Sequence, residues 1–201
     1  MPVDHLHMTT LEVTHSLTNE EIRKVVDMMS SKIPEITDYT FDHRARLIKP
    51  MLSYDGAAIA LSFLPAAGED LHGNRMLKDD GYTYHHLRRD LYDLCKSSGV
   101  AVASRYTVPS AHLTIARFVT QDDFSKADQN ATLIPDPEKM KKWIDVIENT
   151  NLWLQDEYWP RSGKTIGAGG EWIVGKDKGL DCRKGTLWYG GGETVRLGKG
   201  F

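Results

Sequence analysis

Two His-x-Thr tripeptides lie in segments where apolar and polar side chains alternate, and this alternation constrains the fold more than any other feature. His7-Met8-Thr9 belongs to the segment 6–13, and His112-Leu113-Thr114 belongs to the strand-like segment 101–119. In an extended strand, side chains two residues apart point to the same face. We therefore predict two strands, each of which presents a histidine and a threonine side by side. In the second strand the same alternation predicts Ala116 and Phe118 on the face of His112.

Helical spacing predicts three helices. The first begins at Thr18, where Glu21 can complete a capping box, and it is expected to end at Pro34. A second helix is predicted over about 83–98, since apolar residues recur there every three or four positions. The third begins at Asp136, an N-cap residue followed by proline.

Short apolar stretches separated by turn residues predict antiparallel strands. The stretches 47–52 and 57–64 flank a turn at 53–56. Near the C-terminus, 186–189 and 193–197 flank three glycines and predict a closing hairpin. Helices and antiparallel strands together indicate an α+β fold.

Composition and charge argue against several classes of function. The chain has 201 residues, 40% of them hydrophobic, and a formal net charge of -3. This length fits one globular domain, and the charge provides no broad positive surface for extended DNA. Cys95 and Cys182 form no Cys-x-x-Cys pair, so neither a zinc ribbon nor a redox dithiol is expected. Without a signal-like start or a run of 18 apolar residues, we expect a soluble protein of the cytoplasm or nucleus, with no membrane partner.

Paired histidines and threonines suit phosphodiester chemistry. One histidine takes a proton from the attacking hydroxyl or water, while the other gives a proton to the leaving oxygen. Each threonine hydroxyl can hydrogen-bond a non-bridging phosphate oxygen. Such a site needs no metal and no cofactor. The competing interpretation is that the histidines are half-buried strand residues and the threonines serve β-propensity.

The sequences Leu6-His7-Met8-Thr9-Thr10 and Ala111-His112-Leu113-Thr114-Ile115-Ala116-Arg117 resemble the paired motifs of the 2H phosphoesterases, which include LigT-like RNA ligases and cyclic nucleotide phosphodiesterases. The segment Trp188–Gly192 is similar to fungal members. The resemblance implies a bilobal, pseudo-symmetric α+β fold, with two antiparallel sheets flanking a central cleft and helices outside. Residues 1–201 would form a single domain with lobes of about 1–103 and 104–201.

The resemblance also implies an activity and a set of residues. It implies a monomeric, metal-independent hydrolase of 2',3'-cyclic phosphates, or of related nucleotide and RNA-end phosphodiesters. His7 and His112 would be the general acid and base, in an order that the sequence leaves open. Thr9 and Thr114 would bind the phosphate.

Other functional candidates are weaker. His5 is interpreted as a surface histidine. Arg117 is expected on the face opposite His112, where a structural ion pair is at least as well supported as a phosphate contact. The run Ser162-Gly163-Lys164-Thr165 lacks the first glycine of a P-loop. The aromatic residues available to stack on a nucleobase are Tyr54, Tyr106, Trp172, Trp188 and Tyr189.

Two other classes of function stay open at this level. A nucleotide-binding module would keep the same site without turnover. A structural or interaction protein would hold the two histidines far apart. The separation of the two motifs in space distinguishes the structural protein from the other two classes, and turnover distinguishes the enzyme from the binding module.

Overall fold

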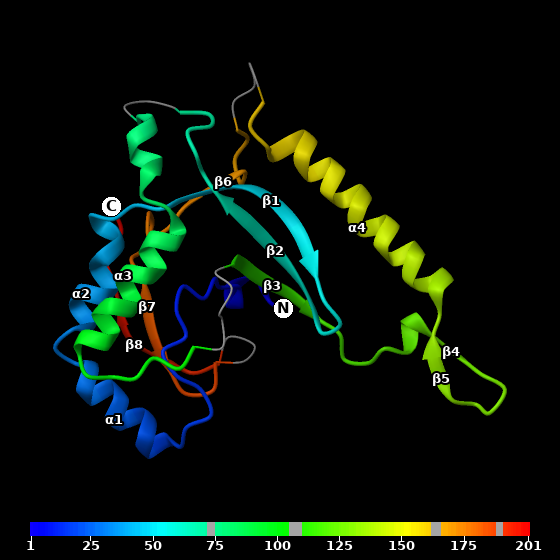
Figure 1. Ribbon diagram of the computed structural model, residues 1–201, viewed down its shortest axis with the longest axis horizontal. Coiled ribbons are helices and arrows are strands. Elements are labelled where there is room, and N and C mark those ends of the chain that lie inside the picture. Colours follow the sequence, from blue (N-terminus) through cyan, green and yellow to red (C-terminus); the bar gives the residue numbers. More distant parts are fainter. Residues whose placement is uncertain (72–74, 105–109, 162–165, 188–190) are drawn as a thin grey trace.

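The computed structural model describes residues 1–71, 75–104, 110–161, 166–187 and 191–201. It is an α+β structure with antiparallel sheets, which confirms the fold class predicted from the sequence (Figure 1). Its helices are α1 (Asn19–Met29), α2 (Ile33–Asp38), α3 (Tyr84–Ser97) and α4 (Pro137–Tyr158), with 3-10 turns η1 (Val3–His5), η2 (Tyr39–Phe41), η3 (Leu77–Gly81) and η4 (Asp122–Phe124). Its strands are β1 (Arg46–Tyr54), β2 (Ala58–Pro65), β3 (Ala111–Arg117), β4 (Ser125–Ala127), β5 (Leu133–Pro135), β6 (Glu171–Ile173), β7 (Asp181–Lys184) and β8 (Glu193–Leu197).

The central sheet has the strand order β3-β2-β1-β6, and all neighbours are antiparallel. β1 and β2 form the hairpin predicted around residues 53–56. A bulge between Ile48 and Met51 shifts the β1–β2 register, and Lys49 there has a φ of 57°. The bulge accommodates Pro50 inside a strand, because a proline has no N–H to give to a regular ladder.

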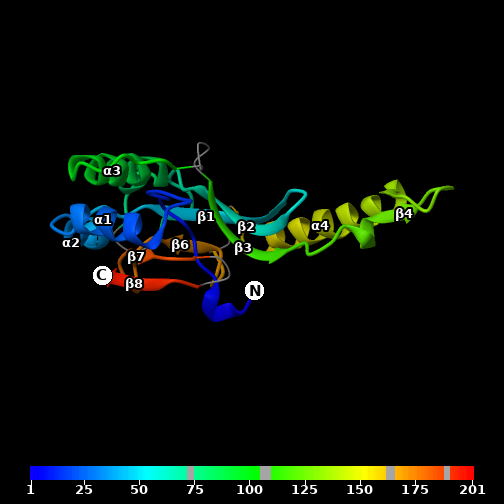
Figure 2. The same ribbon diagram turned by 90° about the horizontal axis from the view of Figure 1, so that it is seen from below.

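The core lies at the end of the sheet that α1, α2 and α3 cover. Four residues of α3 recur at helical spacing and are buried: Tyr84, Leu87, Leu91 and Cys95. They pack in one cluster with Leu47, Phe63 and Leu113 of the sheet. α3 and the β7–β8 ribbon lie on opposite sides of the layer that contains β1 and α1 (Figure 2).

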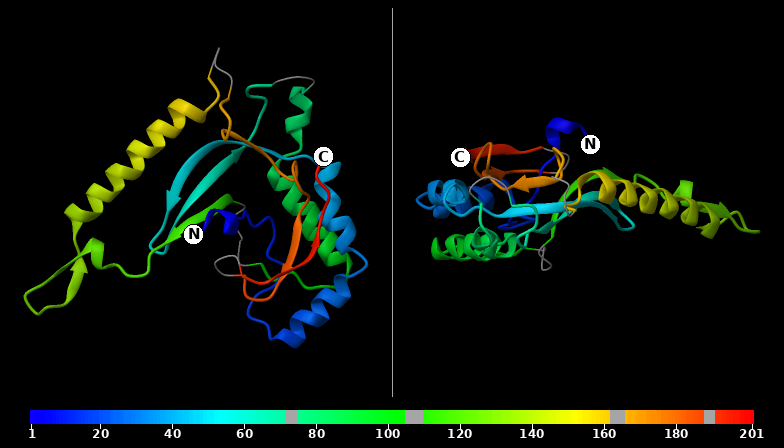
Figure 3. Two further views of the ribbon diagram at one scale, coloured as in Figure 1. Left: turned by 180° about the vertical axis from the view of Figure 1, so that it is seen from behind. Right: turned by 90° about the horizontal axis from the view of Figure 1, so that it is seen from above.

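α4 extends away from this core, and the β4–β5 ribbon lies at its far end (Figure 3). The helix begins at the predicted Asp136 cap, whose carboxylate accepts a hydrogen bond from Glu138 N–H. Asn151 of α4 pairs with backbone groups on the outer edge of β1: its side chain accepts from Leu52 N–H at 2.6 Å and donates to Leu52 O at 3.0 Å. The helix thus takes the place of a neighbouring strand beside that part of β1.

Two local predictions were wrong, and a third lies partly outside the described residues. The first helix ends at Met29, and Pro34 lies in the first turn of α2. A proline is tolerated there because N–H groups of a first turn have no acceptor within the helix. The segment 6–13 forms an isolated bridge, at Met8, rather than a strand. The described partner of β8 is 181–184, whereas Trp188 and Tyr189 of the predicted strand 186–189 lie outside the described residues.

A buried ion pair connects β1 to the turn η3. Arg46, whose side chain has no exposed area, donates to both carboxylate oxygens of Asp80, at 3.1 and 2.7 Å. It also donates to Glu171 of β6 at 2.8 Å. Burial alone would raise the pKa of Asp80, but hydrogen bonds from Arg46 and Arg75 lower it overall.

In the part of the chain that the structure describes, no helix is long and apolar enough to cross a membrane.

Candidate functional site

The first motif docks directly against the second. Met8 and Leu113 form an antiparallel bridge, which places the segment 6–13 along the edge of β3 that β2 leaves open. Two further contacts hold the segment. The buried Tyr84 hydroxyl of α3 donates to Thr9 O at 3.1 Å, and Ala103 N–H donates to Val13 O at 2.9 Å.

The register of this bridge decides which side chains meet. With Met8 opposite Leu113, continued pairing sets His7 opposite Thr114 and Thr9 opposite His112. Residues that are opposite in an antiparallel pair lie on the same face, with Cβ atoms about 4.5–5.5 Å apart. This register would therefore set all four motif side chains on one face, called the motif face below, while Leu113 is buried in the core on the other.

A regular ladder in the register of the Met8–Leu113 bridge would have a local two-fold axis. The axis of an antiparallel pair centred on Met8 and Leu113 exchanges His7 with His112, and Thr9 with Thr114. The two histidines would be diagonal neighbours across this axis, a relation that separates Cβ atoms by about 7–8 Å. A group on the axis would thus meet one histidine from each side.

Both imidazole rings are oriented through Nδ1. His7 Nδ1 lies 3.0 Å from His5 O, and His112 Nδ1 lies 2.9 Å from Ser110 Oγ. A carbonyl oxygen can only accept, so the geometry assigns a proton to Nδ1 of His7 and leaves its Nε2 as the basic nitrogen in the neutral ring. His7 is exposed, whereas Thr9, His112 and Thr114 are half-buried.

Beyond β3, the same face continues onto β2 and β1. Ser62 lies opposite His112, and Ala60 lies opposite Thr114. Ser53 of β1 is opposite Ala60, and its Oγ is 2.6 Å from Ser62 Oγ. Sequence analysis missed Ser62 and Ser110. Ser110 shares the alternation of His112, whereas the position of Ser62 depends on strand pairing.

A bulge in β3 changes the face of the residues that follow Thr114. Thr114 pairs with Ala60 but Ala116 pairs with Ile59, so Ile115 is an extra residue. Ala116 and Phe118 consequently leave the motif face, contrary to the prediction, and Phe118 packs against Trp143 of α4. Arg117 moves onto the motif face, where the alternation had not placed it.

The guanidinium of Arg117 lies toward the β1–β2 turn. Hydrogen bonds from Ala57 N–H and Ala58 N–H hold the pKa of Asp55 below its usual value, and the positive charge of Arg117 lowers that pKa further. Arg117 is exposed. Arg117 therefore lies on the motif face at the hairpin end, with the acidic Asp55 as a neighbour.

Several other candidates have structural roles. His5 is exposed and lies 3.9 Å from Asp4, as expected of a surface histidine. Tyr54 packs edge-on against Trp143, and Trp172 packs against Phe63. The remaining aromatic candidates, Tyr106, Trp188 and Tyr189, lie outside the described residues, as does 162–165.

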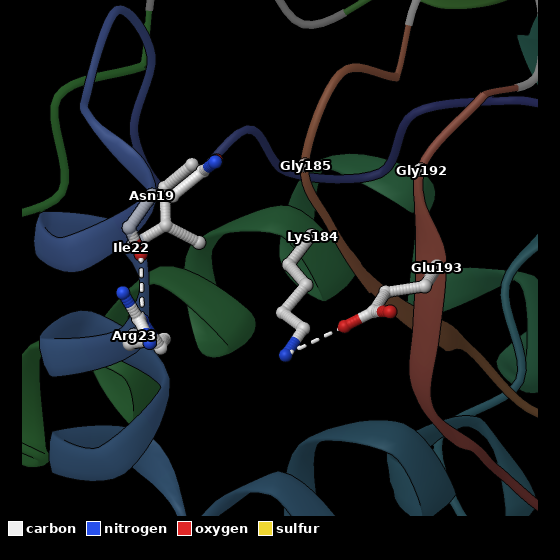
Figure 4. A pocket seen from close by; sticks show the side chains of 7 residues that line it. All are labelled: Asn19, Ile22, Arg23, Lys184, Gly185, Gly192 and Glu193. Atoms are coloured by element: carbon white, nitrogen blue, oxygen red, sulfur yellow. Dashed lines mark hydrogen bonds and ion pairs between the residues drawn. The ribbon is translucent and has the colours of Figure 1, made fainter.

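A separate cavity of about 460 Å³ lies between α1 and the β7–β8 ribbon (Figure 4). Its seven described lining residues all lie outside the two motifs. Lys184 and Glu193 form an ion pair of 2.6 Å across the ribbon, and Arg23 donates to the backbone of α1. These lining residues include no histidine pair that could act as acid and base on a phosphodiester, so the motif face is the stronger site. No cluster of three potential metal-ligating side chains occurs among the described residues.

Comparison with known proteins adds no assignment. No family model matches the chain, and neither a curated protein nor a solved structure matches it. The functional argument therefore depends on the residues and geometry of the motif face.

Proposed function

We propose that this protein is a metal-independent phosphoesterase that hydrolyses 2',3'-cyclic phosphates, or related nucleotide and RNA-end phosphodiesters. The observation that carries the proposal is the Met8–Leu113 bridge, whose local symmetry relates one His/Thr pair to the other. A tetrahedral phosphate on this axis would meet equivalent groups on two sides. The proposal includes the fold: we propose that the chain has the pseudo-symmetric, bilobal arrangement of the 2H phosphoesterases.

The reaction requires one proton to be removed and one to be supplied. One histidine takes a proton from water as the water oxygen attacks phosphorus. The other histidine protonates the ribose oxygen as its bond to phosphorus breaks. The hydroxyl groups of Thr9 and Thr114 donate hydrogen bonds to the non-bridging oxygens, where negative charge gathers in the transition state.

We assign the base to His7 and the acid to His112. With the Nδ1 proton of His7 directed at His5 O, the lone pair of Nε2 remains to accept a proton. Protonated His112 can donate from Nδ1 to Ser110 Oγ and from Nε2 to the leaving oxygen. Ser110 is then a positioning residue that fixes the orientation of the ring.

The test is turnover of nucleoside 2',3'-cyclic monophosphates in EDTA by the wild type, His7→Ala and His112→Ala. We expect wild-type activity in EDTA and a loss of about 10²–10⁴-fold in each variant. His85→Ala, at an exposed histidine of α3, is the matched control and should keep full activity. Full activity in either motif variant, or loss of wild-type activity in EDTA, would contradict the proposal. Saturable binding without product would instead support a nucleotide-binding module.

A further inference from the structure

Small side chains form a floor beside the four motif groups. We use the term sugar floor for Ser53, Ala60 and Ser62, which lie on the motif face of β1 and β2. Ser62 is directly opposite His112 and Ala60 is directly opposite Thr114. Cross-strand neighbours of this kind have Cβ atoms about 4.5–5.5 Å apart, so the floor adjoins the phosphate position.

The geometry favours the sugar floor as the place for the sugar to which the phosphate is attached. Farther along β3, past Thr114, the N-terminus folds back onto the strand, and the Met1 ammonium donates to Ile115 O at 2.8 Å. The sugar floor itself consists of side chains no larger than serine. These short side chains project least from the sheet, so we expect a ring attached to the phosphate above Ala60 and Ser62, with Met51, directly opposite Ser62, at the border.

The floor also supplies hydrogen-bonding groups. Ser53 Oγ and Ser62 Oγ are 2.6 Å apart, and either can be the donor. Ser53 Oγ also lies 3.5 Å from Ala60 O, and when it donates to that carbonyl, Ser62 gives its own proton to Ser53. Lone pairs remain on both serine oxygens in either arrangement, so the pair can accept from a sugar hydroxyl. When Ser53 instead donates to Ser62, the Ser62 proton is left for a sugar oxygen.

We propose that the sugar floor is the ribose subsite, in which Ser62 hydrogen-bonds the sugar and Ala60 leaves space for its ring. This inference rests on the proposed function, since it takes the phosphate to be bound by the two motifs. It makes Ala60 and Ser62 determinants of specificity for nucleoside phosphates over cyclic phosphates that lack a sugar.

The experiment compares two substrates, a nucleoside 2',3'-cyclic monophosphate and the cyclic phosphate of ethylene glycol. Ala60→Leu should lower kcat/KM for the nucleotide by about tenfold or more, because the added branch occupies the ring position. For the small substrate the change should stay below about threefold. Ser62→Ala should raise KM for the nucleotide about fivefold, as expected for one neutral hydrogen bond, and leave the small substrate unaffected. Ala58→Leu adds the same bulk two residues farther along β2 and should match the wild type on both substrates.

The outcomes separate the two proposals. A wild type that turns over neither substrate refutes the proposed function. A wild type that turns over both, with Ala60→Leu equally active or equally impaired on the two substrates, refutes the ribose subsite alone. An equally selective loss in Ala58→Leu also overturns the subsite, because the sugar would then lie elsewhere on the face.

Discussion

Met8 and Leu113 form the bridge that joins the two His-x-Thr motifs, although 104 residues separate them in the chain. The bridge brings the two motifs together and also indicates which of their residues lie opposite each other. Extended to the neighbouring residues, its register would set each histidine opposite the threonine of the other motif, with a two-fold axis between the two histidines. Most of the proposed chemistry follows from this single pairing.

The register itself can be tested by engineered disulfides. Thr9→Cys combined with His112→Cys places two thiols on directly opposite residues, and we expect them to form a disulfide under mild oxidation. Thr9→Cys combined with Thr114→Cys places the thiols diagonally, and should form little. Peptide mapping by mass spectrometry distinguishes the two variants. Preferential crosslinking of the diagonal pair would show that the register is different.

The two threonines should contribute through their hydroxyl groups. Valine keeps the shape of threonine but removes the donor, so Thr9→Val and Thr114→Val should each lower kcat/KM by about 10–100-fold, the effect of losing a hydrogen bond to a charged group. Steady-state kinetics on a cyclic nucleotide measures this. Thr150→Val is the control, because the Thr150 hydroxyl bonds to a helix carbonyl in α4. Unchanged kinetics in both motif variants would remove the threonines from the site.

Leaving-group dependence tests the assignment of acid and base. A nitrophenolate leaves without being protonated, so His112→Ala should lose less than about tenfold on a p-nitrophenyl phosphodiester and about 10²–10⁴-fold on a cyclic nucleotide. His7→Ala should lose activity on both substrates, since water still has to be deprotonated. Rescue of His7→Ala, with none for His112→Ala, would reverse the two roles.

Tyr84 connects α3 to the first motif and should affect both stability and activity. Tyr84→Phe removes the hydrogen bond to Thr9 O and should lower the free energy of unfolding by about 1 kcal/mol, or about 2–4 °C in Tm. We also expect a lower kcat, because the backbone of Thr9 is no longer anchored. Tyr92→Phe, at a more exposed tyrosine of the same helix, is the control for thermal unfolding and turnover. Equal behaviour of the two variants would assign Tyr84 no special role.

The buried Arg46–Asp80 pair should dominate the response to acid. The folded-state pKa of Asp80 is lowered, so its carboxylate stabilises the fold above the unfolded pKa of about 3.9, and that stability is lost as pH falls through the folded value. Asp80→Asn leaves the buried Arg46 with Glu171 still beside it but without the bidentate carboxylate, and should cost up to about 3–5 kcal/mol at pH 7.

Urea unfolding between pH 3 and 7 measures this effect. The difference between wild type and Asp80→Asn should shrink on acidification. Lys24→Met removes an exposed pair with Glu20 and should cost less than about 1 kcal/mol. A constant difference across the pH range would show that the ionisation of Asp80 is not what stabilises the pair.

The sequence by itself determined the features that depend on local chemistry. Thr18 and Asp136 begin helices as predicted, because their side chains satisfy N–H groups only two or three residues away. The β1–β2 hairpin, whose turn lies at 55–57, follows from turn residues between two apolar stretches. Each His-x-Thr motif could be recognised because its chemistry and alternation lie within a few residues.

Only the tertiary structure decided how distant segments pair. The bulge at Ile115 moves Arg117 onto the motif face, and regular alternation carries no sign of the extra residue. The partner of β8 is 181–184, a choice made by packing rather than by β-propensity. Likewise, the segment 6–13 reaches β3 through the Met8 bridge and is held by the hydroxyl of Tyr84, 75 residues away from Thr9. Strand propensity is a property of neighbours in sequence, whereas register and face depend on which buried surfaces fit together.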